Sequence, residues 1–168
     1  MRANTTRLAL LALALTGGMA MAVPSGASSA DRATSAGAAA PLDHTRVYDR
    51  GTLDRLERNK GMSLQWISWD NSRGTVRTRR EDGRIRLTGS QYQANGSGQV
   101  HLDGFVTEVG TGYFTFEGKI RILDAPDQGR ACEADKSWHF AITQQRRYFR
   151  LREFEWCDRL TDYIDIYF

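Results

Sequence analysis

The sequence has few of the residues that build reaction centres and metal sites. Its 168 residues include only two cysteines and three histidines. It contains none of the short motifs of zinc proteases, P-loop proteins, dinucleotide-binding folds or serine hydrolases. His44, His101 and His139 are scattered along the chain, and the last two fall on the outward side of expected strands. We therefore expect no cofactor, no metal and no catalytic set, and we favour a protein that is not an enzyme.

Long apolar runs are also scarce. The run Leu8–Thr16 is far shorter than the ~20 residues that cross a bilayer as a helix. Arg2 and Arg7 precede it and Ala20-Met21-Ala22 follows it, which is the pattern of a cleavable secretory signal. We predict a signal peptide at residues 1–22, no transmembrane helix in the mature chain, and a periplasmic or extracellular location.

Without this segment, the chain has almost no net positive charge. The whole chain carries a net charge of +3, but Arg2 and Arg7 contribute two of these charges. The rest is nearly neutral, so we expect no nucleic-acid partner. Residues 23–40 are rich in Ala, Ser and Gly without periodicity, and we interpret them as a disordered linker, with an alternative cleavage site after Ala30. Residues 41–168 are enough for one β-rich domain.

The two cysteines favour a disulfide in an exported chain. Joining Cys132 to Cys157 should stabilise the fold by roughly 3 kcal/mol in the chain-entropy model. A metal site is the alternative, but His139 is the only imidazole nearby and no C-x-x-C pair exists. We therefore predict the disulfide.

Alternating apolar and polar residues predict a mainly β fold. The expected strands are 64–69, 75–81, 84–92, 99–109, 113–123, 138–143, 148–156 and 163–168, with one short N-terminal helix at Asp49–Gly61 and a polar loop at 124–137. The change of parity between Leu151 and Phe154 indicates a β-bulge near Arg152–Glu153. About eight antiparallel strands suggest a small up-and-down β-barrel, lipocalin-like in architecture only, or a coiled sandwich.

The hairpin 99–123 has the clearest register. Closing it at Gly110-Thr111-Gly112 sets Gly104 against Gly118 on the inward face, which leaves a dimple in the core. The dimple is filled either by a ligand or by Trp66, Trp69 or Trp138. Dense packing of interiors favours a tryptophan. Gly104, Gly118 and Trp138 are nevertheless candidate ligand-binding residues.

A second hairpin, turning at Asp82-Gly83, concentrates arginine. Its outward face carries the other candidate ligand-binding residues: Arg77, Arg79, Arg84 and Arg86. Arg79 lies opposite Arg86, which is destabilising unless something compensates. The favoured explanation is that an acidic cluster packs beside the hairpin and neutralises it; its members are Glu153, Glu155, Asp158, Asp162 and Asp165. The alternative is an open face that binds an anion, such as an envelope lipid, an acidic glycan or an acidic protein.

Three functions compete on this basis. The leading prediction is an exported, disulfide-linked binding domain whose ligand is small and apolar, anionic, or a partner protein. An eight-stranded outer-membrane barrel is the second, although most expected strands are shorter than the ~9–11 residues that a membrane strand needs. The third is a secreted hydrolase that uses the Glu153/Glu155 pair.

Overall fold

A computed structural model describes residues 43–68 and 72–168. The predicted signal peptide and linker lie outside these residues. The described chain contains one helix, α1 (Arg50–Glu57). Its strands are β1 (Arg46–Val47), β2 (Met62–Leu64), β3 (Thr75–Glu81), β4 (Arg84–Tyr92), β5 (Gln99–Gly110), β6 (Tyr113–Leu123), β7 (Ala131–Ala141), β8 (Tyr148–Leu151) and β9 (Ile164–Tyr167). No helix of the described part is long and apolar enough to cross a membrane.

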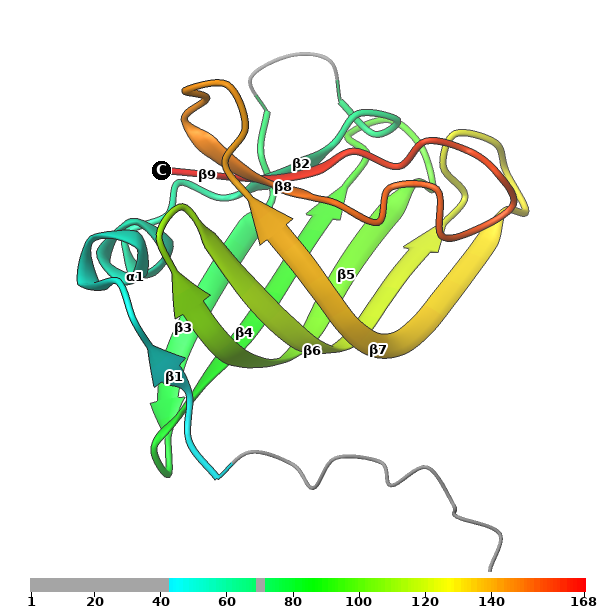
Figure 1. The fold of residues 1–168 in the computed structure, drawn as a ribbon. Coiled ribbons are helices and arrows are strands. Elements are labelled where there is room, and N and C mark those ends of the chain that lie inside the picture. The colour runs from blue at the N-terminus through cyan, green and yellow to red at the C-terminus, as the bar shows by residue number, and fades with distance from the viewer. Residues whose placement is uncertain (1–42, 69–71) are drawn as a thin grey trace, which may run out of the picture. The chain divides into compact units, whose positions relative to one another are not determined.

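The strands form a nearly closed, eight-stranded antiparallel barrel (Figure 1). From β3 to β9 each strand pairs with the next in the sequence, and β9 then pairs with β2. Two backbone hydrogen bonds between Met62 and Gly74, of 2.8 and 3.2 Å, join β2 to the residue before β3. β1 lies off this path and pairs in parallel with β5. The predicted up-and-down barrel is confirmed.

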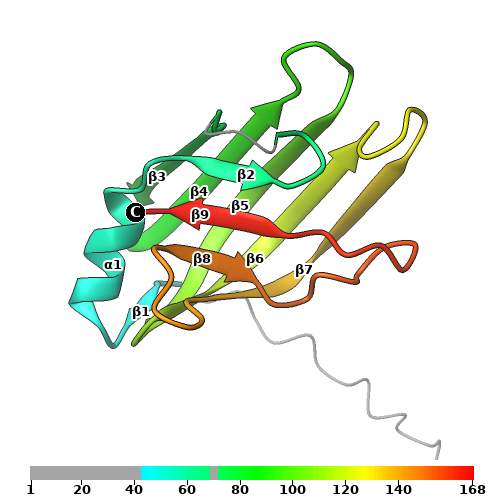
Figure 2. The ribbon, with the colours of Figure 1, turned by 90° about the horizontal axis from the view of Figure 1, so that it is seen from above.

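The core lies between the long strands and a layer of short ones. Strands β2, β9 and β8 cross over the long strands β4–β7 (Figure 2). Phe114 from β6 stacks on Phe140 from β7, with ring centroids 4.9 Å apart, and meets Phe149 from β8 edge-on at 5.3 Å. All three rings are fully buried. Apolar burial of this kind is the main force that holds the two layers together.

Helix α1 sits at one end of the barrel (Figure 1). Its first turn is capped by the Asp49 carboxylate, which accepts a 2.5 Å hydrogen bond from the Thr52 amide. Leu53 and Leu56 are buried in the core. The helix ends at Glu57 rather than near Gly61, because the Asn59 side chain donates to the Leu56 carbonyl and ends the helix early.

Three strand boundaries differ from the prediction. The strand expected at 64–69 ends at Leu64, where the Ile67 amide turns back to the Leu64 carbonyl. The loop expected at 124–137 is wrong from Ala131 onward, because these polar residues pair with β6. The bulged strand expected at 148–156 is also wrong. β8 ends at Leu151, where the chain turns away from the sheet.

The register of the central hairpin is confirmed, except at its turn. Gly104 lies opposite Gly118, as predicted. The turn is one residue shorter, because Gly110 pairs with Tyr113. An extra residue at Thr107 makes up the difference, so this strand carries a bulge that the alternation alone did not indicate.

Candidate functional site

The hairpin of β3 and β4 presents four arginines on its outer face. Asp82 and Gly83 have φ values of 47° and 80°, which is a two-residue turn with both central residues left-handed. The register places Arg79 opposite Arg86, as predicted. Ile85 and Leu87 are buried, and the alternating residues Arg77, Arg79, Arg84 and Arg86 point outward. The structure therefore brings together all four arginines that the sequence singled out.

Two of these arginines have close neighbours on β5. The guanidinium of Arg86 lies 2.5 Å from the Asp103 carboxylate. The guanidinium of Arg84 lies 3.9 Å from the ring centroid of Phe105, within the range of a cation–π contact. Arg86 is thus paired with an acid, whereas Arg84 is stacked on a ring and forms no ion pair in the described chain.

The other two arginines border an open cleft. Arg77 and Arg79 are exposed, and no carboxylate of residues 43–68 and 72–168 forms an ion pair with either of them. A cleft of about 470 Å³ runs along β3 and is lined by both arginines and, from the end of α1, by Glu57 and Asn59. Glu57 itself is bound 2.7 Å from Arg80. The cleft is therefore edged by two arginines that form no ion pair in the described chain, although the carboxylate of Glu81 also lines it.

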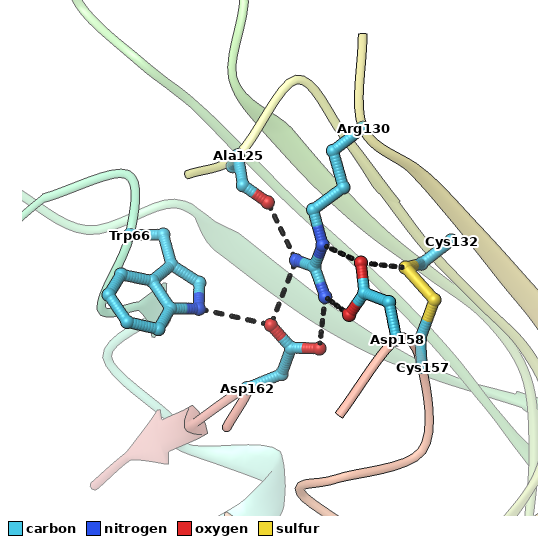
Figure 3. Close-up of a disulfide and its surroundings, with 7 residues drawn as sticks. All are labelled: Trp66, Ala125, Arg130, Cys132, Cys157, Asp158 and Asp162. Atoms are coloured by element: carbon cyan, nitrogen blue, oxygen red, sulfur yellow. Dashed lines mark hydrogen bonds and ion pairs between the residues drawn. A yellow bond between two sulfur atoms is a disulfide. The ribbon is translucent and has the colours of Figure 1, made fainter. Parts of the chain in front are cut away.

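Two of the predicted counter-charges, Asp158 and Asp162, surround Arg130 instead of the hairpin arginines (Figure 3). Arg130 Nε lies 2.8 Å from Asp158 Oδ2, and Nη2 lies 2.9 Å from Asp162 Oδ2. Arg130 also donates to the Ala125 carbonyl at 2.6 Å. The indole of Trp66 donates to Asp162 at 3.1 Å. The Asp162 side chain is 0% exposed and that of Arg130 only 6%, whereas that of Asp158 is 42% exposed, so the Arg130–Asp162 pair is the buried part of this cluster.

The pKa shifts in this cluster follow from burial and hydrogen bonding. Burial raises the pKa of Asp162, against the opposing hydrogen bonds from Arg130 and Trp66. The pKa of Asp158 is lowered, first by its hydrogen bond from Arg130. Burial alone would lower the pKa of Arg130, but the bonds to both carboxylates outweigh it and raise that pKa. Arg130 therefore stays charged in this cluster, with both of its neighbouring carboxylates bound to it.

A second arginine binds another member of the acidic cluster. Arg150 donates to both oxygens of Asp165, each at 2.7 Å, in a bidentate pair that is largely buried. Glu153 accepts a 3.0 Å hydrogen bond from the His139 amide. The expectation that the acidic cluster neutralises the arginine hairpin is therefore wrong. Three of its carboxylates bind Arg130 and Arg150, and a fourth binds the main chain.

The paired glycines mark a close approach of β5 and β6. A Cβ on Gly104 would lie 2.2 Å from the Glu117 carbonyl oxygen and 2.8 Å from the Phe116 ring. The fully buried Trp138 donates its indole N–H to the Gly118 carbonyl at 2.8 Å. The Phe116 ring thus covers Gly104, and Trp138 is bonded to the main chain at Gly118. Of the tryptophans expected to fill the dimple, Trp66 binds Asp162 instead, and Trp69 lies outside the described residues.

The disulfide between Cys132 and Cys157 is confirmed. It consumes both thiols, so neither sulfur is a free thiolate for a metal. It also brings the two halves of the Arg130 cluster together, since Arg130 precedes Cys132 by two positions and Asp158 follows Cys157. This cluster was not predicted from the sequence. The predicted disulfide nevertheless implied it, because a Cys132–Cys157 bond brings Arg130 close to Asp158.

Fold and site together define a small, disulfide-linked, nearly closed antiparallel barrel with one arginine-bearing hairpin. The chain belongs to the PM1083 family, whose family model matches residues 44–168. A relative, an uncharacterised protein of Pasteurella multocida (strain Pm70), is 35% identical over 108 residues, which are 63% of this chain and 69% of the relative. No solved structure matches the chain.

Proposed function

We propose that this protein is an exported binding domain, not an enzyme, and that the outer face of β3 and β4 binds an anionic ligand. One observation carries the proposal: Arg77 and Arg79 border a cleft without an acidic partner in the described chain. Arg84 extends the same face, held against Phe105. Guanidinium groups suit phosphate, sulfate and carboxylate ligands because their donors form a planar fork.

Export is supported by the signal-like first 22 residues and by the disulfide, a bond typical of oxidising compartments. The alternative of an outer-membrane barrel is disfavoured by the direction of the side chains. Arg77, Asp103 and Lys119 point outward, while apolar residues fill the inside. A lipid-spanning barrel needs an apolar outer band.

The test compares two charge-matched double variants. Arg77→Ser/Arg79→Ser removes the two arginines at the cleft, and Arg50→Ser/Arg147→Ser removes two exposed arginines elsewhere. Binding to immobilised heparin, to liposomes containing phosphatidylglycerol and to polyglutamate is measured at low and high salt. These three probes separate an acidic glycan, an anionic lipid and an acidic protein as the source of the anion.

We expect the parent protein to bind at least one probe at low salt, and to lose binding as salt screens the arginines. The cleft variant should bind at least tenfold more weakly at unchanged melting temperature, and the control variant should bind like the parent. A parent that ignores all three probes would refute the proposal. So would two double variants that weaken binding equally, because binding would then follow net charge alone.

A further inference from the structure

The strand β3 has an open edge beside the arginine face. On one side it pairs along its whole length with β4. On the other side, β2 reaches only Gly74, whose amide and carbonyl both bond to Met62. Main-chain groups alternate in direction along an antiparallel strand. The amides and carbonyls of Val76, Thr78 and Arg80 therefore point to the same side as those of Gly74, away from β4.

These edge groups have no backbone or side-chain hydrogen-bond partner among residues 43–68 and 72–168. The cleft of about 470 Å³ lies along this edge, between β3 and the end of α1. A row of free main-chain donors and acceptors beside open space is a template for a further strand.

The charges around the edge specify what kind of strand fits. Arg77 and Arg79 alternate with Val76 and Thr78, so the arginines lie on the outer face and these smaller side chains on the inner face. At the end of the strand, Glu81 shares the outer face, and Arg80 on the other face is bound to Glu57. An added strand would place every second side chain opposite the arginines. Its other side chains would face the inner wall of the cleft, where Glu57 disfavours a second carboxylate.

We propose that β3 accepts an extended, acidic polypeptide segment of a partner protein as an additional strand. Carboxylates at alternate positions of that segment pair with Arg77 and Arg79, and small uncharged side chains lie over Val76 and Thr78. A second copy of this chain is a poor occupant. Pairing two β3 strands edge to edge would bring the arginines of both copies together.

This inference rests on the proposed anion-binding face and names its ligand class. The probe is a synthetic peptide of four Glu-Val repeats with blocked ends. A second peptide of the same sequence carries N-methyl groups on alternate residues, which keeps its charge but removes the donors that a strand needs. A Lys-Val peptide controls for charge.

A proline tests the edge itself. Thr78→Pro removes one edge amide but no hydrogen bond to β4, since the Thr78 amide points away from that strand, and prolines are tolerated at such edge positions. Both arginines remain. Thr78→Val is the matched control, because it changes the side chain and keeps the amide.

We expect the Glu-Val peptide to bind the parent and Thr78→Val alike. Binding should fall at least tenfold with Thr78→Pro and with the N-methylated peptide, while Thr78→Pro keeps the parent's affinity for heparin or liposomes. The Lys-Val peptide should not bind. If Thr78→Pro does not fold, the N-methylated peptide on the parent protein decides the question.

Equal binding of the plain and N-methylated peptides would overturn the inference and leave the anion-binding face standing. The same holds for a parent that binds heparin but not the Glu-Val peptide. Concentration-dependent dimerisation of the parent that Thr78→Pro abolishes would also overturn it, because the occupant of the edge would then be a second copy. A parent that binds no anionic probe would refute both proposals.

Discussion

Two groups of arginines in this barrel differ in their burial and in their pairing with carboxylates. Arg130, beside the disulfide, and Arg150, on β8, are largely buried and lie 2.7–2.9 Å from their carboxylate partners. On β3, by contrast, Arg77 and Arg79 lie exposed with no acid bound to them in the described chain. In the sequence, the opposite net charges of the acidic cluster and the arginine hairpin suggested that these two segments pair with each other. The difference shows that the disulfide and the strand pairing, and not the net charge of each segment, determine which charged side chains form ion pairs.

Removing a buried arginine should have the largest effect. In Arg130→Met, the carboxylate of Asp162 stays buried without its cation, so the free energy of unfolding should fall by about 3–5 kcal/mol. The matched change Arg79→Met, on the exposed hairpin, should alter it by less than about 0.5 kcal/mol. Urea denaturation of both variants measures the contrast.

A rescue variant separates charge from shape in this experiment. Adding Asp162→Leu to Arg130→Met removes the stranded carboxylate and should recover most of the loss, since apolar replacement of a buried ion pair is often neutral. If Arg130→Met alone denatures like Arg79→Met, the buried cluster contributes nothing and the contrast between the two groups disappears.

Breaking the disulfide should cause the second-largest loss of stability. Cys132→Ser with Cys157→Ser should lower the free energy of unfolding by about 3 kcal/mol. Because the disulfide holds Asp158 and Asp162 near Arg130, the cost of Arg130→Met should be smaller in this background than in the parent. Strict additivity of the two changes would mean that the cluster forms without the cross-link. Mass spectrometry after alkylation without reductant verifies that the parent has no free thiol.

A milder change tests the geometry of the second buried pair. Arg150→Lys keeps the charge but cannot make both hydrogen bonds to Asp165, so it should cost about 1–2 kcal/mol. Arg79→Lys, where no such pair exists, should melt like the parent. Equal melting temperatures for the two variants would show that charge alone, without the bidentate geometry, suffices at Arg150.

The smallest expected effect is a change in how folding stability depends on acidic pH. Because the pKa of Asp158 is lowered by Arg130, its contribution is complete above the unfolded carboxyl pKa of about 3.9 and is lost as the pH falls through its lower folded pKa. Asp158→Asn should therefore lose less stability than the parent between about pH 5 and pH 2. Burial of Asp162 acts in the opposite direction and is common to both proteins. Thermal melts across this range compare the two proteins, and a steeper loss in the variant would contradict the assignment.

The sequence predicted the features that depend on neighbours in the chain. Alternation and a two-residue turn signal were enough for the hairpin at Asp82-Gly83, and paired glycines were enough for the register of Gly104 and Gly118. The disulfide followed from the presence of two cysteines behind a predicted export signal.

What the sequence did not predict depends on residues far apart. Residues 131–137 contain no large apolar side chain, and they form a strand only because β6 lies beside them. The strand β8 ends early because its partner β9 begins at Ile164, one residue beyond the Arg150–Asp165 pair, a limit that the apolar residues of β8 do not reveal. Likewise, Asp165 finds Arg150 only after β8 and β9 have paired.

The pairing of β2 with β9 has a consequence for how the protein is made. Ser63 and Tyr167, which share a 2.9 Å hydrogen bond across this seam, are 104 residues apart. The meander from β3 to β7 needs only contacts between successive strands, so it can form before the C-terminal residues have joined the fold. The seam must wait for β9, and it carries the entropy of closing the longest loop in the barrel. Until then, the inner face of the long strands stays uncovered, and that interval is when the chain is most exposed to aggregation.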